Sequence, residues 1–298
     1  MAGTVTTKRK ILLVVNRGSG QPDPAIEEAI ADFIKQNPAH SIGQLILKDK
    51  TDCALIRRHI RQSQPDVVAA VGGDGTVKLV AEMLVGTAVP LGIVPAGSAN
   101  GMAKELLVPS RPDEALRLLL EGTPQRIHLT RVNDELCIHL SDIGFNASVV
   151  RAFDAFPQRG MWGYVKAAWK VLWRHSKMKT VFSINNRTVE SEAVMVVIAN
   201  ATSYGTGVRI NPEGRLDDDL FEVVIVKKIS LTEILKMRLG GLPFDPAKTE
   251  LYQTRSLLIR SSRKVHFQVD GEYCGKVNEV RATLLPDALY VIVPGTPS

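Results

Sequence analysis

Val67-Val-Ala-Ala-Val-Gly-Gly-Asp-Gly-Thr76 joins a short apolar run to a turn that contains three glycines, a carboxylate and a hydroxyl. The run is too short for a helix and is typical of a fully buried strand. Residues 76–84 then repeat apolar side chains at helical spacing, so the glycines lie in a strand-to-helix turn. Glycine tolerates positive φ and lets a ligand approach the backbone, and a helix N-terminus offers unpaired N–H groups that suit phosphate. The carboxylate of Asp74 would repel phosphate unless a cation or a proton transfer is involved, so Asp74 is the first candidate for a chemical role.

The bulk properties describe an ordinary globular chain that is long enough for two domains. It has 298 residues, of which 45% are hydrophobic and 23% charged, and a net charge of +6 that suits either solubility or an anionic partner. No apolar run approaches the roughly 20 residues that span a bilayer. The first ten residues lack an apolar signal core, and three widely spaced cysteines fit reduced thiols. We therefore expect a cytoplasmic protein.

Two halves of the chain differ in pattern. Strand-like runs alternate with helix-like segments in the first half, which predicts an α/β nucleotide-binding domain with a parallel sheet over residues 1–124. Antiparallel strand-like runs predict a β-rich substrate domain over residues 125–298, whose C-terminal tail can return to the first domain. Two helices are expected within this second half, at residues 163–173 and 231–239. We expect the active site in a cleft between the two halves.

The predicted elements follow from these periodicities. In the first half, the predicted strands are 11–15, 42–47, 66–71 and 91–94, and the predicted helices are 24–36, 53–62, 76–84, 100–106 and 112–120. In the second half, the predicted strands are 181–184, 193–199, 220–226, 256–261, 265–269, 280–285 and 289–293.

Two further polar loops, at residues 16–20 and 95–100, follow predicted strands of the same sheet. Either alone is compatible with a simple turn, or with a helix N-cap formed by Ser98 or Asn100. Because ligands bind at the carboxyl ends of parallel strands, the loops together place N–H groups, hydroxyls and amides as a polyphosphate site requires. The first loop matches neither the P-loop nor the dinucleotide-binding glycine motif.

Two acidic segments and one aromatic segment lie in the second half. Asp270-Gly-Glu272 is either a hairpin turn or a carboxylate at a strand end that takes a proton from a hydroxyl. Residues 217–219 are three aspartates, which favour either full solvation or a hard cation. Residues 162–179 contain all three tryptophans among basic residues, which predicts either a helix docked on the β domain or peripheral contact with a membrane.

Taken together, these motifs resemble the diacylglycerol kinase catalytic-domain family, which includes bacterial lipid kinases, sphingosine kinases and ceramide kinases and is distantly related to NAD kinases. The resemblance extends over nearly the whole chain. The segments that carry it are residues 16–20, 72–76, 95–100, 144–147, 216–220 and 270–272.

The resemblance implies an α/β domain and a C-terminal β-sandwich, the two-domain lipid-kinase fold, with transfer of the ATP γ-phosphoryl group to a lipid hydroxyl helped by Mg²⁺. Asp74 is expected to organise Mg²⁺–ATP, and Asp270 or Glu272 to accept the proton. A second metal site is expected at Asp218 with the carbonyls of Arg215 and Leu220. The nucleotide site implied by the family comprises Asn16, Ser19, Gly72, Gly73, Asp74, Gly75, Thr76, Gly97, Ser98 and Asn100.

The chain departs from the family pattern near Asp74, where Lys78-Leu79 replaces Asn-Glu and Gly101 replaces an aspartate. The leading hypothesis is an ATP-dependent kinase of diacylglycerol or a related sphingoid lipid at the membrane surface, with no nucleic-acid partner and with a homodimer possible. One alternative is a kinase of a soluble acceptor such as NAD. Another is a catalytically silent nucleotide- or lipid-binding protein, motivated by the two missing acids.

Overall fold

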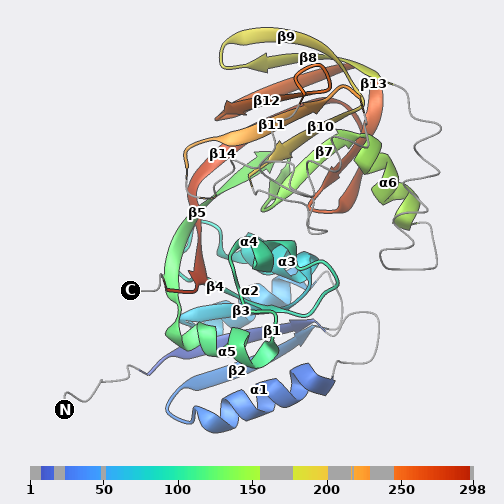
Figure 1. The fold of residues 1–298 in the computed structure, drawn as a ribbon. Coiled ribbons are helices and arrows are strands. Elements are labelled where there is room, and N and C mark those ends of the chain that lie inside the picture. Colours follow the sequence, from blue (N-terminus) through green and yellow to red (C-terminus); the bar gives the residue numbers. More distant parts are fainter. Residues whose placement is uncertain are drawn as a thin grey trace. The chain divides into compact units, whose positions relative to one another are not determined.

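The structure is a computed structural model that describes residues 8–16, 24–47, 52–154, 177–200, 216, 218–228 and 245–295. These residues fall into two compact units (Figure 1). The first lies within Met1–Ile127 and Asp287–Ser298, and the second within His128–Pro286. Strands β5 (Thr123–Val132) and β14 (Glu272–Val293) carry the chain from one unit into the other.

The first unit is built on a parallel sheet, as predicted. Its strands pair in the order β2 (Ser41–Leu47), β1 (Lys10–Asn16), β3 (Val67–Gly72) and β4 (Leu91–Pro95), followed by the end of β14. All of these pairs are parallel. Every residue of β3 and β4 is buried, which explains their uninterrupted apolar runs.

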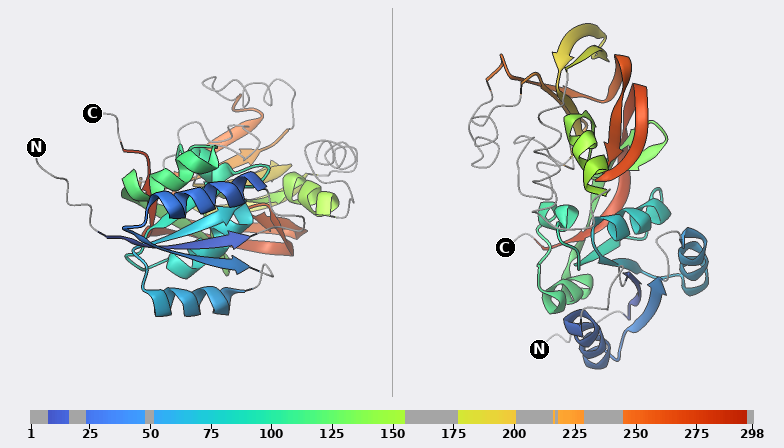
Figure 2. Two further views of the ribbon diagram at one scale, coloured as in Figure 1. Left: turned by 90° about the horizontal axis from the view of Figure 1, so that it is seen from below. Right: turned by 90° about the vertical axis from the view of Figure 1, so that its right-hand side faces the viewer.

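Helices cover both faces of this sheet (Figure 2). α1 (Pro24–Gln36) and α5 (Pro112–Glu121) pack together on one face, and α2 (Cys53–Ser63) and α3 (Asp74–Leu84) on the other. The chain moves from β1 outward to β2 and then back across β1 to β3. Because the crossovers are right-handed, this reversal moves the helices to the opposite face. The point of reversal, between β1 and β3, is where such sheets bind ligands.

The second unit consists mainly of antiparallel strands, again as predicted. Its main sheet runs in the order β12, β11, β10, β7, β13 and β14, while β8 pairs with both β13 and β9. The strands not yet bounded are β6 (Glu135–Cys137), β7 (Leu140–Gly144), β8 (Met178–Ile184), β9 (Arg187–Ala193), β10 (Met195–Ala199), β11 (Phe221–Val226), β12 (Thr249–Thr254) and β13 (Ser256–Val269).

Strands β7, β10 and β11 are buried on both faces. One core cluster takes Ile143, Val196 and Phe221 from these strands, and a second takes alternate residues such as Val197 and Val224. Successive side chains of a strand point to opposite faces, so each strand contributes to both clusters. This double burial accounts for apolar runs without polar alternation.

Several features differ from the sequence-based expectations. Strands β5, β6, β7, β9 and β12 were not predicted. A helix, α6 (Phe145–Asp154), follows β7 where only a motif was expected, because Gly144 has a φ of 101° and ends the strand there. Residues 256–269 form one strand rather than two, with a register shift between Arg260 and Val265. Residues 280–293 likewise belong to the single strand β14. The helices expected at 163–173 and 231–239 lie outside the described residues.

Candidate active site

Three of the predicted loop segments meet at the carboxyl edge of the first unit's sheet. Asn16 ends β1, Gly72 ends β3 and the loop after Pro95 follows β4. The side-chain amide of Asn16 donates to Thr76 Oγ1 at 2.9 Å, and Ala96 N donates to the Gly72 carbonyl at 2.9 Å. The structure therefore brings these segments together, while Ser19 lies outside the described residues.

The glycines of two loops face one another without side chains. A Cβ on Gly73 would lie 3.2 Å from the Cα of Gly97, and a Cβ on Gly97 would lie 2.6 Å from the Cα of Gly73. A Cβ on Gly72 would lie within 2.7 Å of the Thr76 side chain. None of these three glycines has a positive φ. Close approach of the two loops, rather than an unusual backbone conformation, is what requires glycine here.

Asn100 closes the β4–α4 loop instead of capping the helix that follows. It precedes α4 (Gly101–Glu105) and has a φ of 49°, but its side chain makes no capping hydrogen bond. Its Oδ1 accepts from Gly97 N, and its Nδ2 donates to the Gly97 carbonyl, both at 2.8 Å. The helix-cap interpretation is therefore wrong for Asn100. This amide holds the backbone of Gly97, and Gly97 and Ser98 are both exposed.

Asp74 is half-buried in the first turn of α3 and reaches across to the neighbouring loop. Its Oδ1 accepts a hydrogen bond from Met102 N at 3.2 Å. Gly75 beside it is exposed. At the departures from the family pattern, Lys78 is only 5% exposed and engaged in an interaction, Leu79 is half-buried, and Gly101 is buried. Leu79 and Gly101 stand where the family pattern has acids, so Asp74 is the carboxylate of that pattern that this chain keeps here.

The donor set at this edge suits a magnesium ion that arrives with a nucleotide. No group of three or more His, Cys, Asp or Glu side chains that could hold a metal is present in the described part of the chain. Mg²⁺ usually keeps several waters and binds through one or two carboxylates plus substrate phosphates. A single half-buried carboxylate beside exposed loop backbone is consistent with that mode of binding.

The turn at Asp270 and Gly271 is a two-residue hairpin loop between β13 and β14. Val269 pairs with Glu272, and Asp270 and Gly271 have φ values of 52° and 83°. Positive φ at both central residues is typical of the type I′ turn, which favours Asp-Gly. The hairpin interpretation is therefore correct, and it leaves the role of the carboxylates open.

The two carboxylates of this turn have different surroundings. Asp270 accepts hydrogen bonds from three successive backbone N–H groups, those of Ile138, His139 and Leu140, at 2.9–3.2 Å. The Cys137 thiol lies 3.7 Å from the same carboxylate. Glu272, by contrast, is exposed. Asp270 holds the β6–β7 loop in place, while Glu272 is exposed and takes part in an interaction of its own.

The acidic turn before β11 is partly described. Asp218 Oδ1 accepts from Leu220 N at 3.3 Å, and Asp219 pairs with Arg255 at 2.5 Å between Oδ2 and Nη2. Arg215 and Asp217 lie outside the described residues. The predicted ligand set of the second metal site is therefore seen only at Asp218 and Leu220, where a local hydrogen bond occupies one carboxylate oxygen.

Two polar residues near the hairpin turn were not found by sequence reasoning. Asp142 and Gln268 are each 1% exposed and lie opposite one another on β7 and β13. A carboxylate two residues before the family segment at 144–147, between Leu140 and Ile143, was the available sequence signal.

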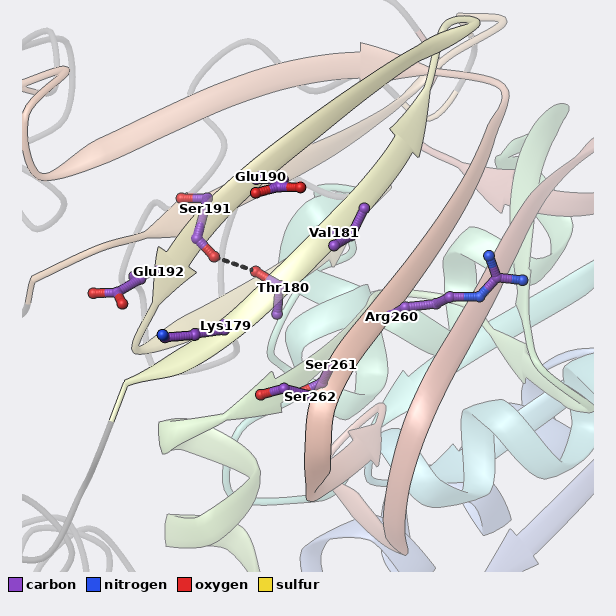
Figure 3. A pocket seen from close by; sticks show the side chains of 9 residues that line it. All are labelled: Lys179, Thr180, Val181, Glu190, Ser191, Glu192, Arg260, Ser261 and Ser262. Carbon is purple, nitrogen blue, oxygen red and sulfur yellow. Dashed lines mark hydrogen bonds between the residues drawn. The ribbon is translucent and has the colours of Figure 1, made fainter.

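A pocket of about 530 Å³ lies on strands β8, β9 and β13 of the second unit (Figure 3). Its lining combines hydroxyls with charges of both signs, and Arg260 pairs with Glu279 at 2.9 Å. None of the predicted site residues lines it. An acyl chain requires apolar walls, so this pocket does not fit the hydrophobic part of a lipid. The lining residues are Lys179, Thr180, Val181, Glu190, Ser191, Glu192, Arg260, Ser261 and Ser262.

The groups with clearly shifted pKa values lie away from these loops, and Glu279 and Tyr252 are two of them. Hydrogen bonds from Arg260 and then Arg281 lower the pKa of Glu279. Burial raises the pKa of Tyr252, with the charge of Glu250 adding to the effect. None of the helices in the described ranges is long and apolar enough to cross a membrane.

Two family models match this chain. Residues 10–132 match the diacylglycerol kinase catalytic domain, and residues 141–293 match the YegS C-terminal NAD kinase beta sandwich-like domain. The chain belongs to the diacylglycerol kinase catalytic-domain family. This confirms the resemblance inferred from the motifs and makes the chain a member of a lipid kinase family.

Relatives and solved structures of this family cover most of the chain. A "Probable lipid kinase YegS-like" of Chromohalobacter salexigens is 28% identical over 291 residues, which is 95% of this chain and 92% of that protein. A "Diacylglycerol kinase" of Mycobacterium tuberculosis is 25% identical over 252 residues, 77% of each chain. A crystal structure described as a diacylglycerol kinase from Bacillus anthracis superposes with a TM-score of 0.71 at 18% identity, covering 96% and 97% of the two chains. The last likeness confirms the two-domain fold.

Proposed function

We propose that this protein transfers the γ-phosphoryl group of ATP to a hydroxyl of diacylglycerol or a related sphingoid lipid. The observation that carries the proposal is the contact between the glycine loops at Gly73 and Gly97, at the carboxyl edge of a parallel sheet in a lipid kinase family. The loop at Gly73 follows β3, which borders the switch point between β1 and β3. The names of the relatives support a lipid acceptor.

In this proposal the first unit holds the nucleotide. Gly97 and Ser98 are exposed, and Asn100 holds the backbone of Gly97. Asn16 positions the hydroxyl of Thr76. Preorganised backbone N–H groups and a helix N-terminus stabilise phosphate charge without reorganisation. Asp74 would hold Mg²⁺, which neutralises the phosphate charge that accumulates during phosphoryl transfer.

The second unit would supply the proton acceptor from the Asp270–Glu272 turn. A lipid hydroxyl becomes a better nucleophile as its proton moves to a carboxylate within hydrogen-bonding reach. Asp270 has its oxygens engaged by the Ile138–Leu140 backbone, which fixes the turn. Glu272 is exposed beside it. The turn thus combines one anchored carboxylate with one exposed carboxylate.

The decisive experiment supplies labelled ATP and Mg²⁺ to the purified protein with a panel of acceptors. Diacylglycerol and sphingosine are presented in detergent micelles, and NAD is presented as the soluble acceptor. Label in a lipid supports the proposal. Label in NAD alone assigns the soluble-acceptor alternative, and ATP binding with no transfer to any acceptor assigns the silent alternative.

Peripheral membrane contact through residues 162–179 is part of the same proposal. A lipid acceptor resides in a bilayer, and an aromatic segment with basic residues suits an anionic lipid surface. Co-sedimentation with vesicles containing phosphatidylglycerol should decrease when Trp169 and Trp173 are replaced by alanine. Equal co-sedimentation of the variant would place the membrane contact elsewhere.

A further inference from the structure

A carboxylate with no assigned step in the proposed reaction is buried in the second unit. Asp142 accepts from Ala147 N at 2.8 Å, from Asn146 Nδ2 at 2.6 Å, and from Gln268 Nε2. These donors compensate the cost of burying its charge. An apolar group of similar size would often fold as well at such a site. The charge of the Asp142 carboxylate is therefore better explained by the hydrogen-bonded groups that it holds in place.

Gln268 continues the line of hydrogen bonds from Asp142 to the hairpin turn. Its Oε1 accepts from Gly271 N at 2.7 Å, and the Ser141 hydroxyl donates to its backbone carbonyl at 2.9 Å. Gly271 lies between Asp270 and Glu272 in the chain. The buried carboxylate is thus two hydrogen bonds away from the turn that carries both proposed proton acceptors.

The donor and acceptor roles in these two hydrogen bonds are fixed by the groups at both ends. A carboxylate only accepts hydrogen bonds, and a backbone N–H only donates. The amide of Gln268 can therefore satisfy Asp142 and Gly271 in a single orientation, with its nitrogen toward Asp142. Because Gln268 is 1% exposed, water cannot readily replace either bond.

We infer that Asp142 is a positioning residue, which acts through Gln268 to hold the Asp270–Glu272 turn for proton acceptance. Asp142 does not touch the acceptor in this inference. Its effect on the rate comes from the turn's geometry, because a misplacement of about 1 Å can lower a rate up to about 100-fold. The inference rests on the proposed function for its catalytic part.

We call the hydrogen bonds from Asp142 through Gln268 to Gly271 the relay. Asp142→Asn tests the relay with an isosteric change. Because the backbone N–H of Ala147 cannot turn, the amide oxygen would stay toward it, and the amide nitrogen would then face both Gln268 Nε2 and Asn146 Nδ2, donor against donor. Turning the Gln268 amide over relieves the clash with Gln268, but then directs its nitrogen toward the N–H of Gly271. Adding Gln268→Glu places one carboxylate oxygen toward the amide nitrogen at position 142 and the other toward Gly271 N. The double variant should therefore restore both hydrogen bonds of the relay.

Three measurements are made on the wild type, Asp142→Asn and the double variant: kcat with ATP KM, thermal unfolding, and hydrogen exchange at the Gly271 amide. We expect Asp142→Asn to lower kcat about tenfold, to leave ATP KM unchanged and to accelerate exchange at Gly271. The double variant should recover most of the kcat and should return exchange at Gly271 close to the wild-type rate. The matched control is Thr180→Val, which removes a buried hydroxyl that donates to the Ser191 carbonyl at 2.8 Å, remote in sequence from the turn.

The outcomes separate the relay from simple destabilisation and from the proposed function. The relay is overturned if Thr180→Val lowers kcat as much as Asp142→Asn at equal loss of thermal stability. It is also overturned if exchange at Gly271 is the same in the wild type and Asp142→Asn. If the wild type transfers phosphate to no lipid, the proposed function fails, while exchange at Gly271 still decides whether Asp142 holds the turn.

Discussion

Gly73 and Gly97 approach so closely that a Cβ added to Gly97 would lie 2.6 Å from the Cα of Gly73. The two residues belong to different loops, and each follows a different strand of the parallel sheet. Their contact brings together the backbone segments that we assign to nucleotide binding. The first two predictions test this edge of the sheet.

Gly97→Ala should separate the two loops and weaken nucleotide binding. Overpacking of this kind typically costs about 1–3 kcal/mol, and we expect the KM for ATP to rise about tenfold. Steady-state kinetics and thermal unfolding measure the two effects. Gly43→Ala is the matched control, because an added Cβ there would have no neighbour closer than 4.0 Å. An unchanged KM for ATP in Gly97→Ala would contradict the assignment of this loop.

Asp74→Asn should retain the fold and lose magnesium-dependent activity. The amide oxygen can still accept the hydrogen bond from Met102 N, so thermal unfolding should change little. Loss of the carboxylate should lower kcat/KM by about 100-fold or more and shift the required Mg²⁺ concentration upward. A Mg²⁺ titration of activity is the measurement. Wild-type activity and Mg²⁺ dependence in the variant would exclude Asp74 as the metal-binding residue.

Asp270→Asn and Glu272→Gln should differ in stability although both reduce activity. Asp270 accepts three backbone N–H groups, so losing its charge should cost about 1–3 kcal/mol of unfolding free energy. Glu272 is exposed, and an exposed interaction contributes little to stability, so its replacement should cost less unfolding free energy than Asp270→Asn. Urea unfolding and kcat are measured for both. Full activity in both variants would remove the turn from the proposed chemistry.

Glu279 should stabilise the fold at neutral pH more than in acid. Hydrogen bonds from Arg260 and Arg281 lower its pKa from the ordinary value of 4.5. A carboxyl group with a lowered folded-state pKa contributes stability above its unfolded pKa and loses it as the pH falls through the folded pKa. The difference in unfolding free energy between wild type and Glu279→Gln should therefore shrink below pH 4.5.

Because Glu279 and its partners are solvent-exposed, that difference should be small and should decrease in high salt. Urea unfolding at several pH values, each at low and high ionic strength, measures it. A difference that grows as the pH falls would contradict the ion-pair origin.

The helix and strand types of the first unit could be predicted because they depend on local periodicity. The predicted helix at 24–36 coincides with α1, and the predicted strands 11–15 and 91–94 fall within β1 and β4. α6 was missed because its start depends on Gly144 and on a hydrogen bond from Ala147 N to Asp142, neither of which has a periodic signal. The division of β13 was wrong because the strand continues through a register shift between Arg260 and Val265, and β13 pairs with β14 on both sides of that shift.

By itself, the sequence determined the α/β and β-rich halves, the glycine turn with Asp74, and membership of a lipid kinase family. These follow from apolar periodicity and from short motifs, which need no knowledge of distant contacts. Only the tertiary structure decided that Gly97 packs on Gly73, that Asp270 is anchored by a backbone about 130 residues away, and that Asp142 reaches the turn through Gln268. Such contacts depend on strand order and register, which bring residues together irrespective of their separation in the chain.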